Sequence, residues 1–237
     1  MTYSESDIAR AIDHAILKPD LTRQDVDAEL DIAAEWGVFS VCVRPSDIAY
    51  AVARLEGTGV AVGTVIGFPH GTTSTAAKVA EVRQALADGA AEVDMVLNIG
   101  WLRSGLDDLV EADIRAVVEA AEGHITKVIF ETAYLDDDEI VRACRATEAA
   151  GADFVKTSTG FAGGGATLAD VTLMRASVGA EVQVKASGGV RSLATAVEML
   201  DAGVTRLGTS ASATILGEAR AIAEGSAAEG AVDESSY

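Results

Sequence analysis

Lysine is scarce in this chain of 237 residues. Of its 18 basic residues, 13 are arginine and only five are lysine. Two of these lysines, Lys156 and Lys185, lie in apolar stretches typical of β-strands, which excludes a simple role in keeping a surface soluble. They are therefore the first candidates for chemistry. The alternative is that each lysine ends a strand and reaches solvent.

Cysteine and histidine are also few. Cys42 and Cys144 are too few for a disulfide framework, and we expect a reducing compartment. The three histidines, His14, His70 and His124, are scattered, and no cluster has the spacing of metal ligands. We therefore expect no metal and no other cofactor.

Long apolar runs and aromatic residues are lacking too. No stretch of 18 consecutive apolar residues occurs, and the N-terminus has neither the basic start nor the apolar centre of a signal peptide. We expect a cytoplasmic protein with no membrane partner. Aromatic residues make up only 5% of the chain, so we expect a core of small and aliphatic side chains.

Positive charge is outweighed two to one. The 37 acidic and 18 basic residues give a net charge of −19, which repels phosphate backbones and disfavours nucleic acid as a partner. An acidic chain that uses arginine in place of lysine suits a salt-rich cytoplasm, and we expect a halophilic source. A small anionic substrate is still possible where oriented backbone amides outweigh the remote field.

Strand and helix patterns alternate along the whole chain. A chain of this length suits one (β/α)₈ TIM barrel of roughly 250 residues, so we expect a single domain over residues 1–222. A short helix over residues 7–12 comes first, and a flexible acidic tail over residues 223–237 comes last. An open doubly wound sheet is the alternative, since counting strands does not prove closure. We expect strands over residues 12–19, 40–45, 60–68, 92–98, 126–131, 154–158, 182–186 and 206–209. The helix after the first strand is expected to be capped by Thr22 with Asp25 and to end at Gly37. Further helices are expected over residues 46–55, 74–88, 106–121, 137–150, 167–177 and 192–202.

Two stretches share one pattern: VKTSTG from Val155 to Gly160 and VKASGG from Val184 to Gly189. Their lysines are 29 residues apart, about one strand-plus-helix unit, so Lys156 and Lys185 are expected at the same height on neighbouring parallel strands. Two buried ammonium groups would suppress each other's charge. A neutral amine is the form that attacks a carbonyl to give a Schiff base.

Acidic residues interrupt two of the expected strands. In EVDMVLN, strand alternation places Asp94 on the same face as Val96 and Asn98. If that face is the barrel interior, Asp94 needs a cation, and an inward lysine is the natural partner; a structural ion pair is the alternative. Asp13, in the first expected strand, would likewise need a cation if it faces the interior. The neighbouring His14 is expected to be packed or hydrogen-bonded and not a ligand.

Glycine gathers directly after the last three expected strands. The segments are GFAGGG from Gly160 to Gly165, SGGVR from Ser187 to Arg191 and GTSAS from Gly208 to Ser212. Unobstructed backbone amides in these loops are suited to phosphate, and the loops after strands 7 and 8 of a barrel are a common phosphate site.

The chain resembles the 2-deoxyribose-5-phosphate aldolase family. The resemblance rests on segments that match in order between Ile12 and Ser212: IDHAILKP, SVCVRP, VIGFPHG, EVDMVLNIG, KVIFETAYL, FVKTSTGF, VKASGGVR and RLGTSAS. It implies a class I, metal-independent aldolase, a lyase that reversibly cleaves 2-deoxy-D-ribose 5-phosphate into D-glyceraldehyde 3-phosphate and acetaldehyde.

The resemblance also implies roles for individual residues. Lys156 would form the Schiff base, Lys185 would be the cation that perturbs it, and Asp94 would donate and accept protons. Some relatives end in a tyrosine that a flexible tail brings to the site, and Tyr237 could in the same way relay a proton; an accidental aromatic at the end of a tail is the alternative. The implied substrate-binding residues are Asp13, Cys42, Thr159, Gly160, Gly188, Gly189 and Ser210.

Two positions depart from the family pattern. Phe161 stands where some members have lysine, and Ala211 stands where some have a second serine. Both changes remove polarity from the expected phosphate site. Another Schiff-base barrel aldolase and a non-catalytic phosphate-binding barrel are the alternatives, and the expected partners are a sugar phosphate substrate and further copies of this chain in a homo-oligomer.

Overall fold

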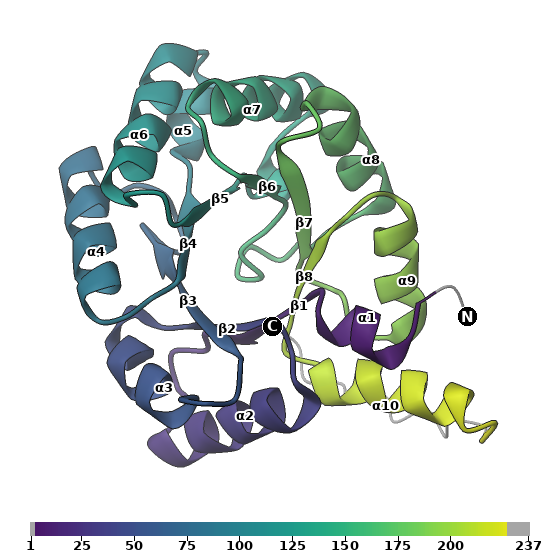
Figure 1. Ribbon diagram of the computed structural model, residues 1–237. Helices are drawn as coiled ribbons and strands as arrows, with labels where there is room; N and C mark the ends of the chain where they lie inside the picture. Colours follow the sequence, from purple (N-terminus) through teal and green to yellow (C-terminus); the bar gives the residue numbers. More distant parts are fainter. Residues whose placement is uncertain (1–2, 227–237) are drawn as a thin grey trace.

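The strands of the computed structural model, which describes residues 3–226, form one closed barrel (Figure 1). Each strand pairs in parallel with the next, and β1 pairs with β8, so the open-sheet alternative is wrong. The barrel expected from the sequence is confirmed. Its strands are β1 (Ile12–Ile16), β2 (Ser40–Val43), β3 (Ala61–Ile66), β4 (Glu92–Val96), β5 (Ile125–Ile129), β6 (Phe154–Lys156), β7 (Gln183–Ser187) and β8 (Arg206–Thr209).

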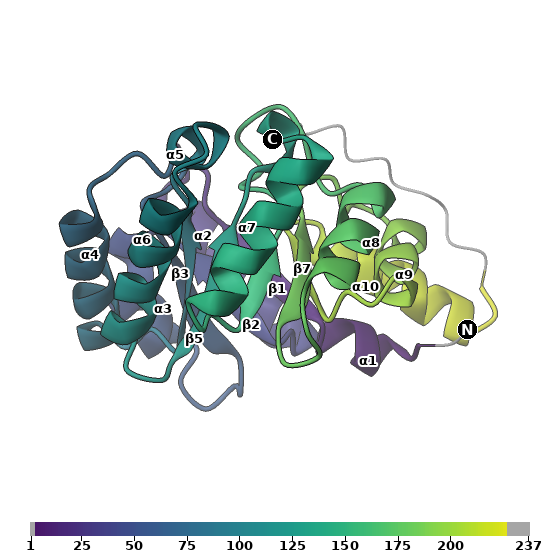
Figure 2. The same cartoon turned by 90° about the horizontal axis from the view of Figure 1, so that it is seen from above.

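Helices ring the outside of the barrel, and the view from above shows α1 at one end and α5 at the other (Figure 2). Two 3₁₀ turns, η1 (Pro45–Asp47) and η2 (Thr132–Tyr134), follow strands β2 and β5. The α-helices are α1 (Glu5–Ala9), α2 (Arg23–Trp36), α3 (Ile48–Arg54), α4 (Thr75–Ala87), α5 (Ile99–Arg103), α6 (Asp107–Ala120), α7 (Asp137–Ala149), α8 (Leu168–Ser177), α9 (Leu193–Asp201) and α10 (Ser212–Ala223).

The ends of α2 show how local sequence fixes a helix. Thr22 and Asp25 form the expected capping box, in which each side chain accepts a hydrogen bond from the other's backbone N–H. At the other end Gly37 adopts a left-handed conformation, with φ of 58°, that a side chain would disfavour. The helix therefore starts and stops where the sequence predicts.

The two faces of the sheet differ in chemistry. On β4, Val93 and Met95 are fully buried in the apolar core that fills the space beneath the helices. The alternate residues, Glu92 and Asp94, are buried inside the barrel among charged partners. The barrel interior is thus polar, and the layer between the strands and the helices supplies the hydrophobic core.

A few elements differ from the sequence expectation. The N-terminal helix begins earlier, because Ser4 and Asp7 form a capping box ahead of it. The sequence patterns also missed α5 and α10. The expected domain end at residue 222 falls in the last turn of α10, and most of the expected tail lies outside the described residues.

No helix within residues 3–226 is both long and apolar enough to cross a lipid bilayer.

Candidate active site

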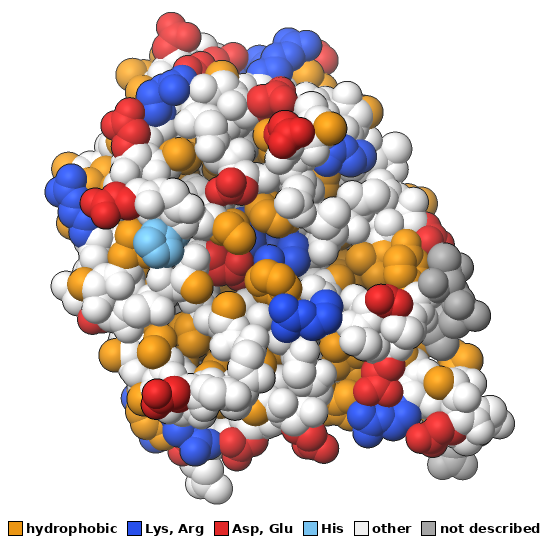
Figure 3. Space-filling view, viewed as in Figure 1, with side chains coloured by type: hydrophobic (Ala, Val, Ile, Leu, Met, Phe, Trp, Pro, Cys, Tyr) orange, Lys and Arg blue, Asp and Glu red, His pale blue; other side chains and the backbone are white. Residues whose placement is uncertain are grey.

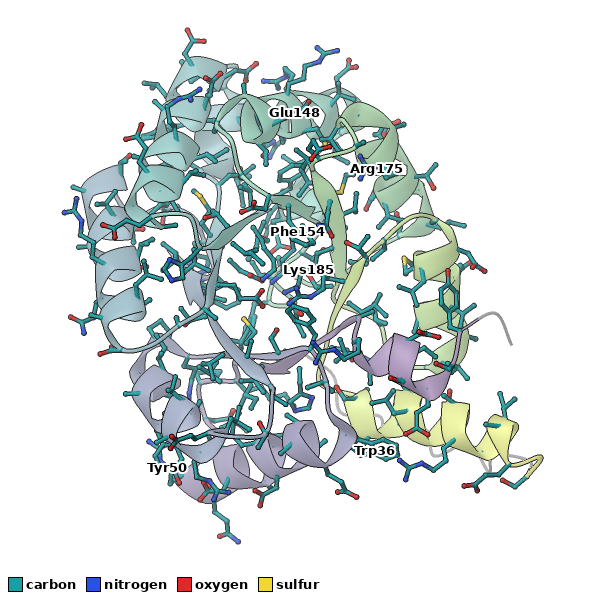
Figure 4. The ribbon with its side chains drawn as sticks, viewed as in Figure 1. Trp36, Tyr50, Glu148, Phe154, Arg175 and Lys185 are labelled. Carbon is teal, nitrogen blue, oxygen red and sulfur yellow. The ribbon has the colours of Figure 1, made fainter. Side chains whose placement is uncertain are left out.

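Lys156 and Lys185 lie side by side inside the barrel. The pairing of β6 with β7 places the two residues in direct register, as their spacing predicted. Both are almost completely buried, with 4% and 1% of their surfaces exposed. Figure 4 shows Lys185 near the centre of the barrel.

Asp94 joins the two lysines. One of its oxygens, Oδ2, accepts hydrogen bonds from Lys156 Nζ at 2.7 Å and from Lys185 Nζ at 2.8 Å. The other oxygen, Oδ1, accepts one from Lys127 Nζ at 2.9 Å. The expected inward orientation of Asp94 is therefore confirmed, and three lysines contact one carboxylate.

The surroundings shift the pKa values of the two lysines in opposite directions. Burial lowers the pKa of Lys156, and the Lys185 ammonium lowers it further, although Asp94 opposes both. Burial also disfavours the charge of Lys185, but the carboxylates of Asp13 and Asp94 raise its pKa above the ordinary value. The expectation that the lysines suppress each other's charge therefore fails for Lys185, because this residue has a second carboxylate partner.

The two carboxylates stay ionised. Burial acts to protonate Asp94, but Lys127, Lys156 and Lys185 together hold its pKa well below the usual value. Asp13 is likewise buried, and Lys185, Lys127 and Arg206 bring its pKa to about 2. The site thus contains one lysine that loses its proton more easily than an ordinary lysine, next to an ammonium group and two carboxylates.

A pocket opens above these charges, and it collects most of the residues singled out from the sequence. Asp94 lies below the pocket and does not line it, and Arg191 lines it in addition to the expected residues. Its lining includes Asp13, Cys42, Lys156, Thr159, Gly160, Lys185, Gly188, Gly189 and Ser210.

One wall of the pocket is a glycine turn after β7. Gly188 and Gly189 both have φ of 79°, a left-handed conformation that favours glycine. The loop after β6 packs directly on this turn: Ala166 N donates to Gly188 O at 3.0 Å, and a Cβ on Gly165 would lie 2.4 Å from the same oxygen. Two of the three glycine segments noted in the sequence, those after β6 and β7, are therefore packed together.

Glu131, which supports the pocket residue Thr159 from outside the lining, is a residue that sequence reasoning missed. It is 1% exposed, has a φ of 59° that is unusual for a residue with a side chain, and accepts hydrogen bonds from the backbone N–H and hydroxyl of Thr159. Burial raises its pKa. The only signal in the sequence was a lone acidic residue ending an apolar strand.

Leu17 and Cys42 add apolar side chains to the pocket lining. Phe161, which stands where some family members have lysine, does not line the pocket but contacts Phe68 edge to face, with ring centroids 5.3 Å apart. Cys42 packs with Leu17 and Val65, and burial followed by the charge of Asp94 raises the pKa of its thiol to about 11. A thiol that holds its proton so firmly is a poor nucleophile at neutral pH.

Two remaining expectations concern His14 and Tyr237. His14 is hydrogen-bonded as expected, with Nδ1 2.8 Å from Ser212 Oγ and Nε2 2.7 Å from Glu29 Oε2. Tyr237 lies outside the described residues. Among residues 3–226, no group of three or more His, Cys, Asp or Glu side chains could hold a metal ion.

Comparison with known proteins gives a consistent result. Residues 8–211 match the family model described as DeoC/LacD family aldolase. Deoxyribose-phosphate aldolase 2 of Staphylococcus aureus (strain MRSA252) is 56% identical over 208 residues, which is 88% of this chain and 94% of that protein. A structure titled as the tetrameric deoxyribose phosphate aldolase from Aeropyrum pernix has a TM-score of 0.84 at 30% identity, over 92% of this chain and 93% of that one.

Proposed function

The chain belongs to the DeoC/LacD family of aldolases, and from this premise we propose that it cleaves 2-deoxy-D-ribose 5-phosphate reversibly into D-glyceraldehyde 3-phosphate and acetaldehyde. The observation that carries the proposal is the position of Lys156: its amine is buried, has a lowered pKa and lines the pocket beside Lys185. A lysine in this state is suited to form a Schiff base with a sugar aldehyde.

The chemistry proceeds through a covalent intermediate on Lys156. The neutral amine adds to the C1 carbonyl of the open-chain sugar, and loss of water gives an iminium ion. Removal of the proton from the C3 hydroxyl breaks the C2–C3 bond, and the electron pair flows into the iminium to give an enamine. D-glyceraldehyde 3-phosphate leaves, C2 takes up a proton, and hydrolysis releases acetaldehyde and the free lysine.

The proton steps fall to Asp94 and Lys185. The pKa of Asp94 is lowered and that of Lys185 is raised, so the resting site holds a carboxylate with room for a proton and an ammonium group with a proton to give. The two groups are 2.8 Å apart, so a proton accepted by Asp94 during the reaction can return through Lys185. Lys185 also lowers the pKa of Lys156 by its charge.

The phosphate end of the substrate is assigned to the glycine turn. We assign Gly188, Gly189 and Ser210 to the phosphate, with Thr159 and Gly160 next to the sugar and Asp13 and Cys42 at the deeper end. Phe161 and Ala211 leave this site less polar than the family pattern, so backbone amides have the larger share of phosphate binding.

The biological setting completes the proposal. A lyase of this kind acts in deoxyribonucleotide catabolism, and we place it in the cytoplasm of a halophilic organism because the chain carries a net charge of −19. The Aeropyrum pernix relative is described as tetrameric, and we infer that this chain also forms a homo-oligomer.

Trapping the Schiff base tests the proposed function. Incubation of the protein with acetaldehyde and borohydride should give one two-carbon adduct, located on Lys156 by peptide mass mapping. Lys156→Arg should abolish both the adduct and sugar cleavage, because a guanidinium group stays protonated and is no amine nucleophile. An undiminished adduct in that variant would remove Lys156 from its role.

A comparison of substrates distinguishes this reaction from that of another Schiff-base aldolase. Cleavage should be faster with 2-deoxy-D-ribose 5-phosphate than with other pentose and hexose phosphates. A trapped adduct together with faster cleavage of a different sugar phosphate would retain the mechanism and replace the substrate. Absence of any adduct would favour a non-catalytic binding barrel.

A further inference from the structure

The charges around Asp94 continue below the pocket. Arg206 on β8 donates from Nε to Asp13 Oδ1 at 2.6 Å, and its Nη2 lies 2.8 Å from Glu92 Oε1. Lys127 Nζ lies 3.0 Å from the same Glu92 oxygen. Glu92 and Arg206 are only 3% and 5% exposed, and neither lines the pocket.

Both groups belong to one connected network with Lys156. From Arg206, ion pairs run to Asp13, from Asp13 to Lys185, and on through Asp94 to Lys156. Seen along the barrel axis, acidic and basic side chains lie together at the centre of the molecule (Figure 3). The network consists of three carboxylates, Asp13, Glu92 and Asp94, and four basic groups, Lys127, Lys156, Lys185 and Arg206.

The barrel is built to hold these buried charges. Gly63 on β3 stands next to Glu92, and a Cβ there would lie 2.9 Å from Glu92 Cγ. Gly208 stands next to Lys185 in the same way, with a Cβ position 3.3 Å from Lys185 Cε. Arg206 also stacks on the ring of Phe39, with its Cζ 3.6 Å from the ring centroid.

The network holds one more basic group than carboxylates. A buried cluster with an uncompensated charge is costly, so one basic group should release its proton. Arg206 cannot, because guanidinium stays protonated in proteins. Lys127 and Lys185 each contact two or more carboxylates and have raised pKa values, whereas Asp94 is the one carboxylate within residues 3–226 that forms an ion pair with Lys156.

We propose that Glu92 and Arg206 are positioning residues that set the charge balance of the buried network, so that Lys156 is the basic group left without a proton. They act through the network and without touching substrate. The inference rests on the proposed function, since the neutral state matters only if Lys156 is the nucleophile. In this view Arg206 supplies the fixed positive charge that Lys156 would otherwise carry.

Other titratable groups also face Lys156. Cys42 on β2 and Arg191 after β7 line the same pocket, and Cys42 keeps its proton. Glu131 after β5 feels the charge of Lys156, and its own hydrogen bonds go to Thr159. Strand β3 has no titratable residue. The remaining groups, on β1, β4, β5, β7 and β8, are the members of the network itself.

The proposal predicts opposite shifts in the pH dependence of kcat/KM. Activity should rise with pH as Lys156 in the free enzyme loses its proton. Glu92→Gln removes a negative charge and so disfavours the Lys156 ammonium. The increase of kcat/KM with pH, called the rise below, should therefore occur about one pH unit lower. Arg206→Gln removes a positive charge and should move it about one pH unit higher. The double variant should return the rise close to its position in the unchanged protein.

Two further variants serve as controls. Arg206→Lys keeps the charge and should leave the rise in place. Asp113→Asn removes a carboxylate from the buried Lys78–Asp113 pair outside the barrel interior, so it should lower the melting temperature without moving the rise. If Glu92 or Arg206 had a purely structural role, its variant would lose activity equally at every pH. The rise would then stay in place, as expected for Asp113→Asn.

The rate of adduct formation with acetaldehyde and cyanoborohydride, followed by intact mass across pH, gives an independent readout. Matching shifts in this rate and in kcat/KM support the proposal. If the pH dependence does not change in either variant, or moves in the same direction in both while the Lys156 adduct still forms, the charge-balance proposal is wrong and the proposed function is unaffected. If Arg206→Gln fails to fold, Glu92→Gln decides alone, and an unmoved rise in that variant rejects the proposal. Loss of the adduct in the unchanged protein would instead reject the proposed function.

Discussion

Asp94 shows how much a single residue depends on its neighbours. A carboxylate with 1% of its surface exposed would ordinarily take up a proton, yet three lysine amines within 2.9 Å hold it ionised. The same contacts affect the lysines unequally. Lys185 has a second carboxylate in Asp13 and keeps its proton, whereas Lys156 has only Asp94 and loses it more easily.

The role of Lys185 can be tested by changing its charge and its proton separately. Lys185→Leu removes the cation next to Lys156, so the pKa of Lys156 should rise and the increase of kcat/KM with pH should shift to higher pH. Loss of proton transfer should also reduce kcat/KM by about 100-fold or more. Steady-state cleavage rates across pH measure both effects.

Lys185→Arg is the matched variant. It keeps a positive charge but cannot exchange a proton, so the pH dependence should stay in place while kcat falls. If Lys185→Leu keeps the original pH dependence, its charge does not set the pKa of Lys156.

Tyr237 is the residue whose role depends on the resemblance alone, since it lies outside the described residues. If its phenol relays a proton to the enamine carbon, Tyr237→Phe should slow cleavage by about tenfold or more and leave the Lys156 adduct intact. Exchange of acetaldehyde methyl protons with solvent, followed by NMR, isolates the proton step. Exchange at the rate of the unchanged protein would exclude the relay.

At the scale of elements, the site is made by the carboxyl ends of strands and the loops that follow them. Strands β6 and β7 place the two lysines in register, and the loops after them pack on each other through Ala166 and Gly188. A parallel barrel brings these ends to one side, which is why segments separated by a whole helix meet in one pocket.

The contact between the loops after β6 and β7 can be disturbed by adding a single methyl group at Gly165. Gly165→Ala would place a Cβ 2.4 Å from Gly188 O, so the glycine turn must move. We expect KM for the phosphorylated sugar to rise about tenfold, while the adduct of Lys156 with acetaldehyde, which has no phosphate, still forms at its former rate.

Gly163→Ala is the control in the same loop. Its φ of 75° makes alanine unfavourable there, but a Cβ would meet no atom within 4 Å. It should reduce stability slightly and leave KM within about twofold of its original value. Equal effects of the two substitutions on KM would show that loop strain, and not the displaced turn, affects binding.

At the scale of the whole molecule, the surface and the interior carry different charge patterns. The chain has a net charge of −19, yet the buried network inside the barrel contains more basic groups than carboxylates. The excess negative charge therefore lies outside the network, where salt can screen it.

Salt should accordingly stabilise this protein. Raising KCl from about 0.1 M to about 1 M shortens the screening length from about 10 Å to about 3 Å. We expect the melting temperature to rise by about 5 °C, the shift that about 2 kcal/mol produces in a chain of this size. Sucrose at equal osmolality is the control for solvent exclusion, and an unchanged melting temperature in KCl would contradict the expected adaptation to salt.

Local patterns along the chain predict the strands, most helices and the side-by-side placement of Lys156 and Lys185. These features depend on local patterns: apolar runs, capping residues such as Thr22, and a repeated motif whose 29-residue spacing matches one barrel unit. Such patterns act within one element or between neighbouring ones, so they can be read along the chain.

The tertiary structure was needed to show that the barrel closes and which charges meet inside it. No role was predicted for Glu92, Lys127, Glu131 and Arg206, although they lie within segments that carry the family resemblance. Their contacts depend on which side chains face the barrel interior, and the contacts of Arg206 with Asp13 on β1 and Glu92 on β4 also depend on closure. The opposite pKa directions of Lys156 and Lys185 have the same origin. Each depends on how many carboxylates lie within contact distance, and that number is a property of three-dimensional arrangement.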